Sequence, residues 1–353
     1  MGLGTGVGGI AADALGNLYY TFVFMNSESE HSFAVRVGKM TPSGSEAWTS
    51  LIDGYEHEYM SSLAVGRGKT AAVYVSATST SQMPGHPPAA KGHPVVAKFG
   101  TNGKTTWLKQ SASFGTSQSH GVRMAADLSG NVYILPINTS DIGNTILKLD
   151  NQGTVVWQAT LVVPRDRSRA SLSNLEVSPD GKSIYVLGTK DNSLLVIKLD
   201  PSGRQQWVRI TETRHSVVLD PVEGVRWDGT GRRLSSLYAS ASNEALYVAF
   251  PYWNTYVHGS RPREPHTDVL VAAFNQASGK LQWARQYGLS STGQQRGNLE
   301  YIQAMPNGEL VVAAKIPTKP PGYDLNHAVF RLRPSGDPVT PTQPAKAPSK
   351  KAK

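Results

Sequence analysis

The residues of this chain best suited to chemistry lie in a few short clusters of polar and aromatic side chains. The densest runs from Tyr55 to Tyr59 and places Glu56, His57 and Glu58 between two tyrosines. Two carboxylates beside an imidazole can carry out acid-base work or bind a cation. A polar loop anchored by its tyrosines is the alternative interpretation of the same segment.

A second cluster combines aromatic rings with cations: Tyr252, Trp253 and Tyr256 are followed by His258, Arg261 and Arg263. Aromatic platforms beside hydrogen-bond donors suit a sugar, an anionic group or a protein partner. The alternative is a loop that packs over the mouth of a central channel. Arg165, Arg167 and Trp227 are further candidates for ligand binding. The alternative is that these cationic segments are solvated or form ion pairs.

Histidines gather in or beside the same kinds of segment. All nine fall in or beside long loops or blade connections: His31, His57, His86, His93, His120, His215, His258, His266 and His327. Several on one surface could ligate a metal, but histidine also prefers surfaces, and no HExxH pairing is present. We therefore predict no cofactor. Calcium and quinone lack support, because no carboxylate set or tryptophan platform for them can be picked out.

The elements that must position these residues come from a repeat. The pattern glycine, three residues, tryptophan occurs five times, at Gly44 to Trp48, Gly103 to Trp107, Gly153 to Trp157, Gly203 to Trp207 and Gly279 to Trp283. A period near fifty residues is typical of repeat architectures whose units pack only on their neighbours. Arg331-Leu332 before Gly336 marks a sixth unit, in which Thr340 stands where the tryptophan is expected.

Each unit contains two hairpins and hence four strands, A to D. Turns such as Asp200 to Gly203 read x-Pro-Ser-Gly, which closes a tight hairpin. The strand before the turn is almost wholly apolar, as in Leu194 to Ile197, so we expect it to be buried on both faces, with its terminal lysine extending to solvent. A preceding hairpin, such as Asp127 to Tyr133, supplies strands A and B.

Repeated four-stranded antiparallel sheets predict an all-β fold, a β-propeller of six blades. A seventh blade is possible only if the segment from Thr211 to Leu234 contains one. Small residues in strand A, such as Ala64 and Ala125, suit the tapering axis. We expect a single propeller over residues 1–338, with ring closure by the segment after Gly336 or by Met1 to Gly6, and a disordered Pro/Lys-rich tail over 339–353. The expected blades are 7–52, 58–109, 119–161, 170–211, 234–287 and 297–338.

The repeat resembles bacterial propeller repeats of the SBBP type and the related PQQ-like repeats. The segment from Leu195 to Ile210 looks like the second half of such a unit, and the G-N-V-Y at Gly130 like the start of the first half. The resemblance covers nearly the whole chain to Pro338 and implies the fold. It leaves function open, because propellers host many unrelated roles.

Loop lengths indicate where a ligand would bind. The A-to-B and C-to-D turns are uniformly tight, whereas the B-to-C loops and the D-to-A connections hold every insertion, including Ala77 to His93 and Tyr252 to Thr267. Since function concentrates in loops on a rigid scaffold, we predict a non-catalytic binding or scaffolding module whose long-loop face binds a protein or carbohydrate. The alternative is a propeller enzyme, a quinoprotein-like dehydrogenase or a hydrolase or lyase, with its site at the channel mouth.

Composition narrows the partners and the compartment. The formal charge is +9, and Lys346, Lys350, Lys351 and Lys353 of the tail carry part of it, so we do not expect nucleic acid binding. No apolar run approaches the roughly twenty residues that a membrane helix needs, and we expect a monomer. Cysteine is absent. The family resemblance favours an extracellular or cell-envelope setting, and the missing signal peptide leaves the cytoplasm as the alternative.

Overall fold

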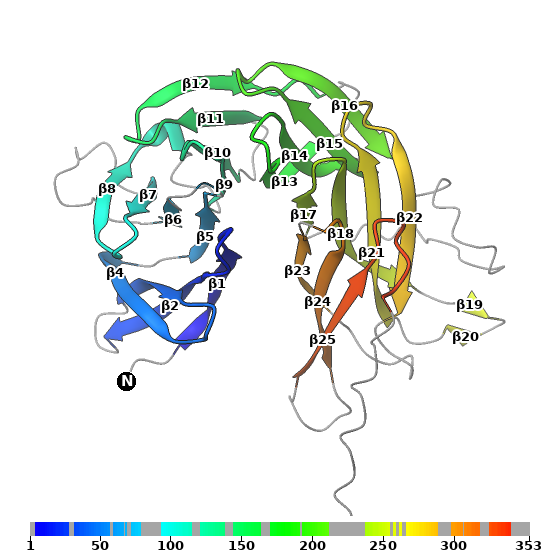
Figure 1. The fold of residues 1–353 in the computed structure, drawn as a ribbon, viewed down its shortest axis with the longest axis horizontal. Helices are drawn as coiled ribbons and strands as arrows, with labels where there is room; N and C mark the ends of the chain where they lie inside the picture. Colours follow the sequence, from blue (N-terminus) through cyan, green and yellow to red (C-terminus); the bar gives the residue numbers. More distant parts are fainter. Residues whose placement is uncertain are drawn as a thin grey trace, which may run out of the picture.

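A computed structural model of the chain shows six antiparallel sheets placed one after another around a curved path (Figure 1). The fold is a six-bladed β-propeller, as predicted. The structure describes residues 4–27, 32–56, 59–66, 68, 72–78, 93–114, 121–137, 144–163, 170–190, 193–211, 237–254, 257–258, 261–262, 266–288, 298–305, 307–317 and 325–339.

The first three blades have four strands each. Blade 1 contains β1 (Gly4–Ala12), β2 (Leu18–Ser27), β3 (Ser32–Met40) and β4 (Glu46–Glu56). Blade 2 contains β5 (Tyr59–Val65), β6 (Val73–Thr78), β7 (Pro94–Phe99) and β8 (Thr105–Gln110), and a short 3-10 helix, η2 (Ala112–Phe114), follows it. Blade 3 contains β9 (Val122–Ala126), β10 (Val132–Pro136), β11 (Thr145–Leu149) and β12 (Val155–Thr160).

The later blades are less uniform. Blade 4 contains β13 (Ala170–Val177), β14 (Ile184–Lys190), β15 (Ser193–Leu199) and β16 (Gln205–Thr211). Blade 5 contains β17 (Tyr238–Ala241), β18 (Ala245–Asn254), β21 (His266–Asn275) and β22 (Leu281–Gly288), with a separate two-stranded ribbon of β19 (Val257–His258) and β20 (Arg261–Pro262). Blade 6 contains β23 (Asn298–Ala304), β24 (Leu310–Pro317) and β25 (Leu325–Leu332).

Every blade joins its strands in chain order, and the first strand of each lies innermost (Figure 1). Successive innermost strands β1, β5, β9, β13, β17 and β23 contact one another. Small side chains permit this approach: Ala64, Ala125 and Ala126 on these strands are buried.

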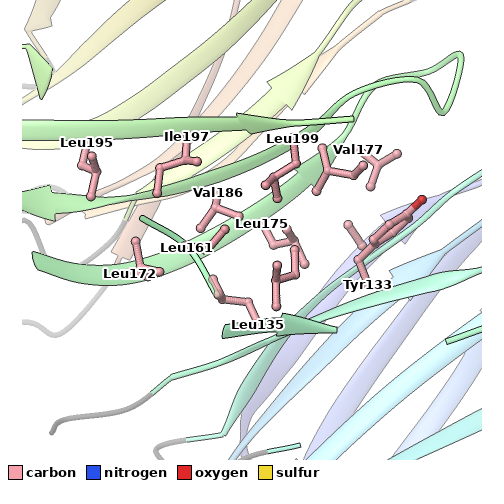
Figure 2. Packing of buried hydrophobic residues seen from close by; sticks show 13 residues of the cluster. Tyr133, Leu135, Leu161, Leu172, Leu175, Val177, Val186, Leu195, Ile197 and Leu199 are labelled. Atoms are coloured by element: carbon pink, nitrogen blue, oxygen red, sulfur yellow. The ribbon is translucent and has the colours of Figure 1, made fainter. Parts of the chain in front are cut away.

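The hydrophobic core is divided into clusters that lie between neighbouring blades. Figure 2 shows the cluster between blades 3 and 4, where Leu135 of β10 meets Leu172 and Leu175 of β13 and Ile197 of β15. The third strand of blades 2 to 5 is buried on both faces, because each face meets another blade. Leu194 to Ile197 of β15 are all at most 2% exposed, which confirms the prediction for this strand.

The repeated glycine and tryptophan are two halves of a contact between blades. A Cβ on Gly203 would come within 3.0 Å of the Trp157 ring of the preceding blade, and the Trp157 Nε1–H donates to the Pro201 carbonyl at 3.1 Å. We call this arrangement the Trp–Gly contact. Its ring packing occurs at all five junctions from blade 1 to blade 6, as the pairs Trp48 with Gly103, Trp107 with Gly153, Trp157 with Gly203, Trp207 with Gly279 and Trp283 with Gly336. The indole hydrogen bond is present at four of them, all but that of Trp207.

The spacing that recurs in the repeat aligns a tyrosine, a lysine and a tryptophan in one row across three strands of a blade. In blade 2, Tyr74, Lys98 and Trp107 lie opposite one another in register. The Lys98 ammonium lies 5.9 Å from the centre of the Tyr74 ring and donates to the Asn151 carbonyl of blade 3 at 3.0 Å. The prediction that this lysine extends to solvent is therefore wrong for Lys98, which is only 9% exposed, because the next blade covers it.

Gln276 and Ala277 lengthen the C-to-D turn of blade 5, and the longer turn changes the hydrogen bonds that blade 4 makes to it. The Asn275 N–H bonds to the Lys280 carbonyl, so the loop is one residue longer than the turn closed by Asp200 and Arg204. The Gln276 carbonyl accepts a hydrogen bond from Lys198 at 2.9 Å. The Trp207 indole N–H, which faces this turn, is buried without a partner among the described residues.

Blades 1 and 6 face each other across an opening, which we call the seam (Figure 1). The described part of the N-terminal segment, from Gly4, belongs to the innermost strand β1, where Gly4 pairs with Phe24 and Gly6 with Val23. It does not supply an outer strand, which corrects that part of the closure hypothesis. The start of a fourth strand in blade 6 is instead the bridge between Leu332 and Pro338.

Candidate functional site

The structure describes most of the tight-turn edge of the propeller, whereas most residues of the predicted insertions lie outside the described residues. One edge consists of tight turns, such as Asp127 to Asn131 and Asp200 to Arg204, each closed by backbone hydrogen bonds of 2.9 to 3.2 Å. Carboxylates rigidify them: Asp200 accepts hydrogen bonds from Ser202 and Arg204, and the Ser202 hydroxyl is the largest cause that lowers the Asp200 pKa to about 2. The opposite edge carries the connections with insertions.

The second and third strands of blade 5 form a long hairpin that reaches toward the insertion edge. Its β18 and β21 pair without interruption from Ala245 opposite Asn275 to Asn254 opposite His266, ten residues on each strand. By contrast, β10 of blade 3 has five residues. Beyond the end of this hairpin, Val257 pairs with Pro262 and His258 with Arg261 in the β19–β20 ribbon. Figure 1 shows that ribbon outside the arc of blades.

Most of the second predicted cluster lies on β18 and on the separate β19–β20 ribbon. Tyr252 and Trp253 lie at the far end of β18, His258 in β19 and Arg261 in β20. Tyr256 and Arg263, which complete the cluster in the sequence, lie outside the described residues. The structure therefore places the backbone of two of the six candidates on the β18–β21 hairpin and of two on the β19–β20 ribbon.

The first predicted cluster lies at a connection between blades. Glu56 ends β4, where it pairs with Ser32, and Tyr59 begins β5, so the segment joins blade 1 to blade 2. His57 and Glu58 lie outside the described residues, as do Arg165, Arg167 and Trp227. Blades 1 and 5 belong to opposite arms of the arc, so the structure does not bring this cluster to the blade 5 hairpin (Figure 1).

Metal-binding groups do not converge in the part of the chain that the structure describes: no three histidine, aspartate or glutamate side chains there could hold one ion. His258, His266 and His327 lie in strands of different blades or of the ribbon, and His93 precedes β7. The described residues also include no helix that could cross a membrane.

A cation near the axis was missed by the sequence analysis, which concentrated on loops. Arg123 lies on the innermost strand β9, and its Nε–H donates to the Ser173 carbonyl of β13 at 3.2 Å. Burial lowers the pKa of this guanidinium, and Tyr238 of β17 partly opposes the shift. An arginine between the apolar Val122 and Met124 of a predicted inner strand was the available signal.

Comparison with known proteins agrees on the fold alone. An intramolecular trans-sialidase from Ruminococcus gnavus superposes with a TM-score of 0.53 at 9% identity, covering 94% of this chain and 95% of that one. The Pseudomonas aeruginosa periplasmic gluconolactonase PpgL gives 0.49 at 14% identity, covering 92% of this chain and 80% of that one.

A dihydro-heme d1 dehydrogenase, NirN, gives a TM-score of 0.43 at 12% identity, covering 94% of this chain, which spans 65% of that protein. No protein-family model and no curated protein matches the sequence. The likeness to the trans-sialidase agrees with the β-propeller fold, and at 9% identity it transfers no activity.

Proposed function

We propose that the chain is a binding module whose insertion edge binds a protein or carbohydrate partner, chiefly through the blade 5 hairpin. The uninterrupted β18–β21 pairing and the ribbon beyond it are the observation that carries this proposal. A paired hairpin holds aromatic and cationic residues on a more rigid support than an irregular loop would, and this lowers the entropy lost on binding.

The chemistry of the hairpin suits that role. Tyr252 and Trp253 offer large ring surfaces, and His258 and Arg261 offer hydrogen-bond donors, the combination found at the energetic centres of binding surfaces. We further propose that the repeat is of the SBBP or PQQ-like type, supported by the Leu195 to Ile210 segment. Lys198 and Trp207 of that segment contact the next blade.

The proposal predicts that two substitutions on the hairpin weaken binding without affecting the fold. Ligands would first be found by a glycan array and by capture of protein partners, then ranked by the rise in melting temperature that binding causes by mass action. Trp253→Ala and Arg261→Ala should each weaken the affinity for the selected ligand at least about tenfold, measured by calorimetric titration, because they remove a ring surface and a cation.

A matched pair on the tight-turn edge serves as the control. Leu128 and Arg204 are exposed there, so Leu128→Ala and Arg204→Ala remove an apolar group and a cation of similar kind. These variants should bind like the unmodified chain. Equal losses at both edges, or full affinity in both hairpin variants, would show that the hairpin is not the binding surface.

A further inference from the structure

The C-to-D turn of blade 1 is the one such turn that no tryptophan covers among the described residues. Gly44 has a φ of 83°, like the other turn glycines, yet no described atom lies within 4 Å of the position of a Cβ on it. At Gly103, the equivalent Cβ would lie 2.7 Å from the Trp48 ring. By the register of the other junctions, the tryptophan that belongs over Gly44 would come from the outer strand of blade 6.

Blade 1 also presents large apolar side chains, beside one arginine, toward the seam. Tyr19, Val35 and Val37 face blade 2 in a buried cluster, so their neighbours along each strand point the other way. Ile10, Phe22 and Leu51 on that opposite face are between 39% and 50% exposed. The Tyr20 ring lies 5.2 Å from the Phe22 ring and occupies the space that a Cβ on Gly38 would need. Arg36 lies in register between Phe22 and Leu51 and is exposed on the same face, where the faces buried between blades carry apolar residues such as Val95.

The outer edge of β25 in blade 6, where the other blades have a fourth strand, is largely unpaired among the described residues. Strand β25 pairs with β24 along the whole strand, but its outer edge makes only the Leu332–Pro338 bridge and a hydrogen bond from the Val339 N–H to the Arg331 carbonyl, as far as the described residues extend. Val329 on the seam side of β25 is 66% exposed. Such an edge can pair with an added strand.

The chain's own continuation is poorly suited to complete this edge. Thr340 stands where the other blades have tryptophan, and Pro341 and Pro344 have no N–H to donate to a ladder. The other outer strands share a different pattern, a tryptophan followed two residues later by a hydrogen-bond donor in four of five blades: Ser50, Lys109, Arg209 and Arg285. Lys109 and Arg209 donate to carbonyls of the next blade's turn.

The geometry points to a second binding site at the seam, whose ligand is an extended peptide strand of another protein that carries a tryptophan followed two residues later by a cation. This strand pairs with the outer edge of β25 and displaces the single bridge at Pro338. Its indole packs on Gly44 and donates to the Pro42 carbonyl, as the Trp157 indole does to Pro201. Its cation bonds to the blade 1 turn. For both contacts to form at once, blades 6 and 1 must approach each other across the seam to the separation of the other junctions, and the ligand then joins them by the contact that joins the other blades.

The repeat itself provides the probe. A fluorescently labelled peptide with the sequence of Gln205–Thr211, QQWVRIT, is titrated with the full chain, and binding is followed by fluorescence anisotropy. Saturable binding is expected, and replacing the peptide tryptophan by alanine should weaken it at least about tenfold. Gly44→Asn should weaken it to a similar extent. Asparagine tolerates the left-handed backbone, but its side chain occupies the place of the indole.

Gly181→Asn is the matched control, since Gly181 also has a positive φ, 70°, in a tight turn but lies away from the seam. This variant should bind the peptide like the unmodified chain, and circular dichroism should show that both variants fold. Absence of binding, binding that does not depend on the peptide tryptophan, or full binding by Gly44→Asn would each overturn the proposal. Self-association that Gly44→Asn abolishes, without peptide binding, would assign the surface to a second copy of the chain and overturn it as well.

Discussion

The Trp157→Ala variant is expected to lose about 3 kcal/mol of unfolding free energy, near the lower end of values for removing a large aromatic side chain from a packed site. Its ring packs on Gly203 of the next blade and lies 5.9 Å from the Tyr133 ring of its own blade. Truncation leaves a cavity between blades 3 and 4 and removes the hydrogen bond to Pro201. Urea denaturation followed by far-ultraviolet circular dichroism measures the loss.

Trp157→Phe separates the contribution of the ring from that of the hydrogen bond, and Val156→Ala serves as the control. Trp157→Phe keeps an aromatic ring and removes the N–H donor, so it should cost about 1 kcal/mol, the typical net contribution of one hydrogen bond. Val156 is adjacent and exposed, and Val156→Ala should change stability by less than about 0.5 kcal/mol. If Trp157→Ala unfolded at the same urea concentration as Val156→Ala, the Trp–Gly contact would have no structural role.

Gly188→Ala is expected to cost at least about 3 kcal/mol and to prevent accumulation of soluble protein, because it forces an atom into neighbouring backbone. A Cβ on Gly188 of β14 would overlap the Ser171 carbonyl oxygen and lie 2.9 Å from the Leu172 Cα of β13. The strands cannot separate locally, since β14 also pairs with β15. Soluble yield and the thermal unfolding midpoint measure the effect.

Gly66→Ala is the appropriate comparison for this substitution. The nearest atoms to a Cβ on Gly66 are 3.4 Å away, which is ordinary van der Waals contact. That variant should express normally and unfold within a few degrees of the unmodified chain. A Gly188→Ala protein that matched Gly66→Ala in yield and midpoint would show that β13 and β14 do not approach each other as described.

The number and order of the blades could be predicted from sequence because the signals are local. The turn chemistry at Gly44 or Gly203 and the apolar run from Leu194 to Ile197 each involve only a few consecutive residues. The pairing across blades could not be predicted. Trp48 contacts Gly103 and not Gly44, its neighbour in the repeat, and a spacing that recurs in every unit does not say which copy is the partner.

The lysine of the third strand shows the same limit. Within one blade, a lysine at a strand end has solvent as its obvious destination. The next blade supplies the Asn151 carbonyl that Lys98 bonds, and only the assembled ring reveals it. Arg123 was missed for a related reason. Its partner, the Ser173 carbonyl, belongs to the next blade, so the contact exists only when the two blades pack side by side.

The sequence predicted the edge of the propeller that carries the candidate binding site, but only part of the arrangement of its residues. Loop length identified the insertion edge, and β18 and β21 place Tyr252 and Trp253 on a hairpin of that edge. Residues such as His57 and Trp227 have no periodic pattern that relates them to a strand, and they lie outside the described residues. The link between the blade 5 hairpin and a ligand stays a prediction.

Native-state hydrogen exchange tests the central claim most directly, namely that Trp–Gly contacts join six blades at five junctions and leave one seam. In such an array, the free energy of unfolding of a blade is the sum of the blade's intrinsic stability and the stabilities of its interfaces with neighbouring blades. Amides of β2 and β3 in blade 1 and of β24 in blade 6 should therefore open at clearly lower free energy than those of β10, β11 and β14, which lie in blades with two such junctions. Equal protection across all six blades would contradict the account.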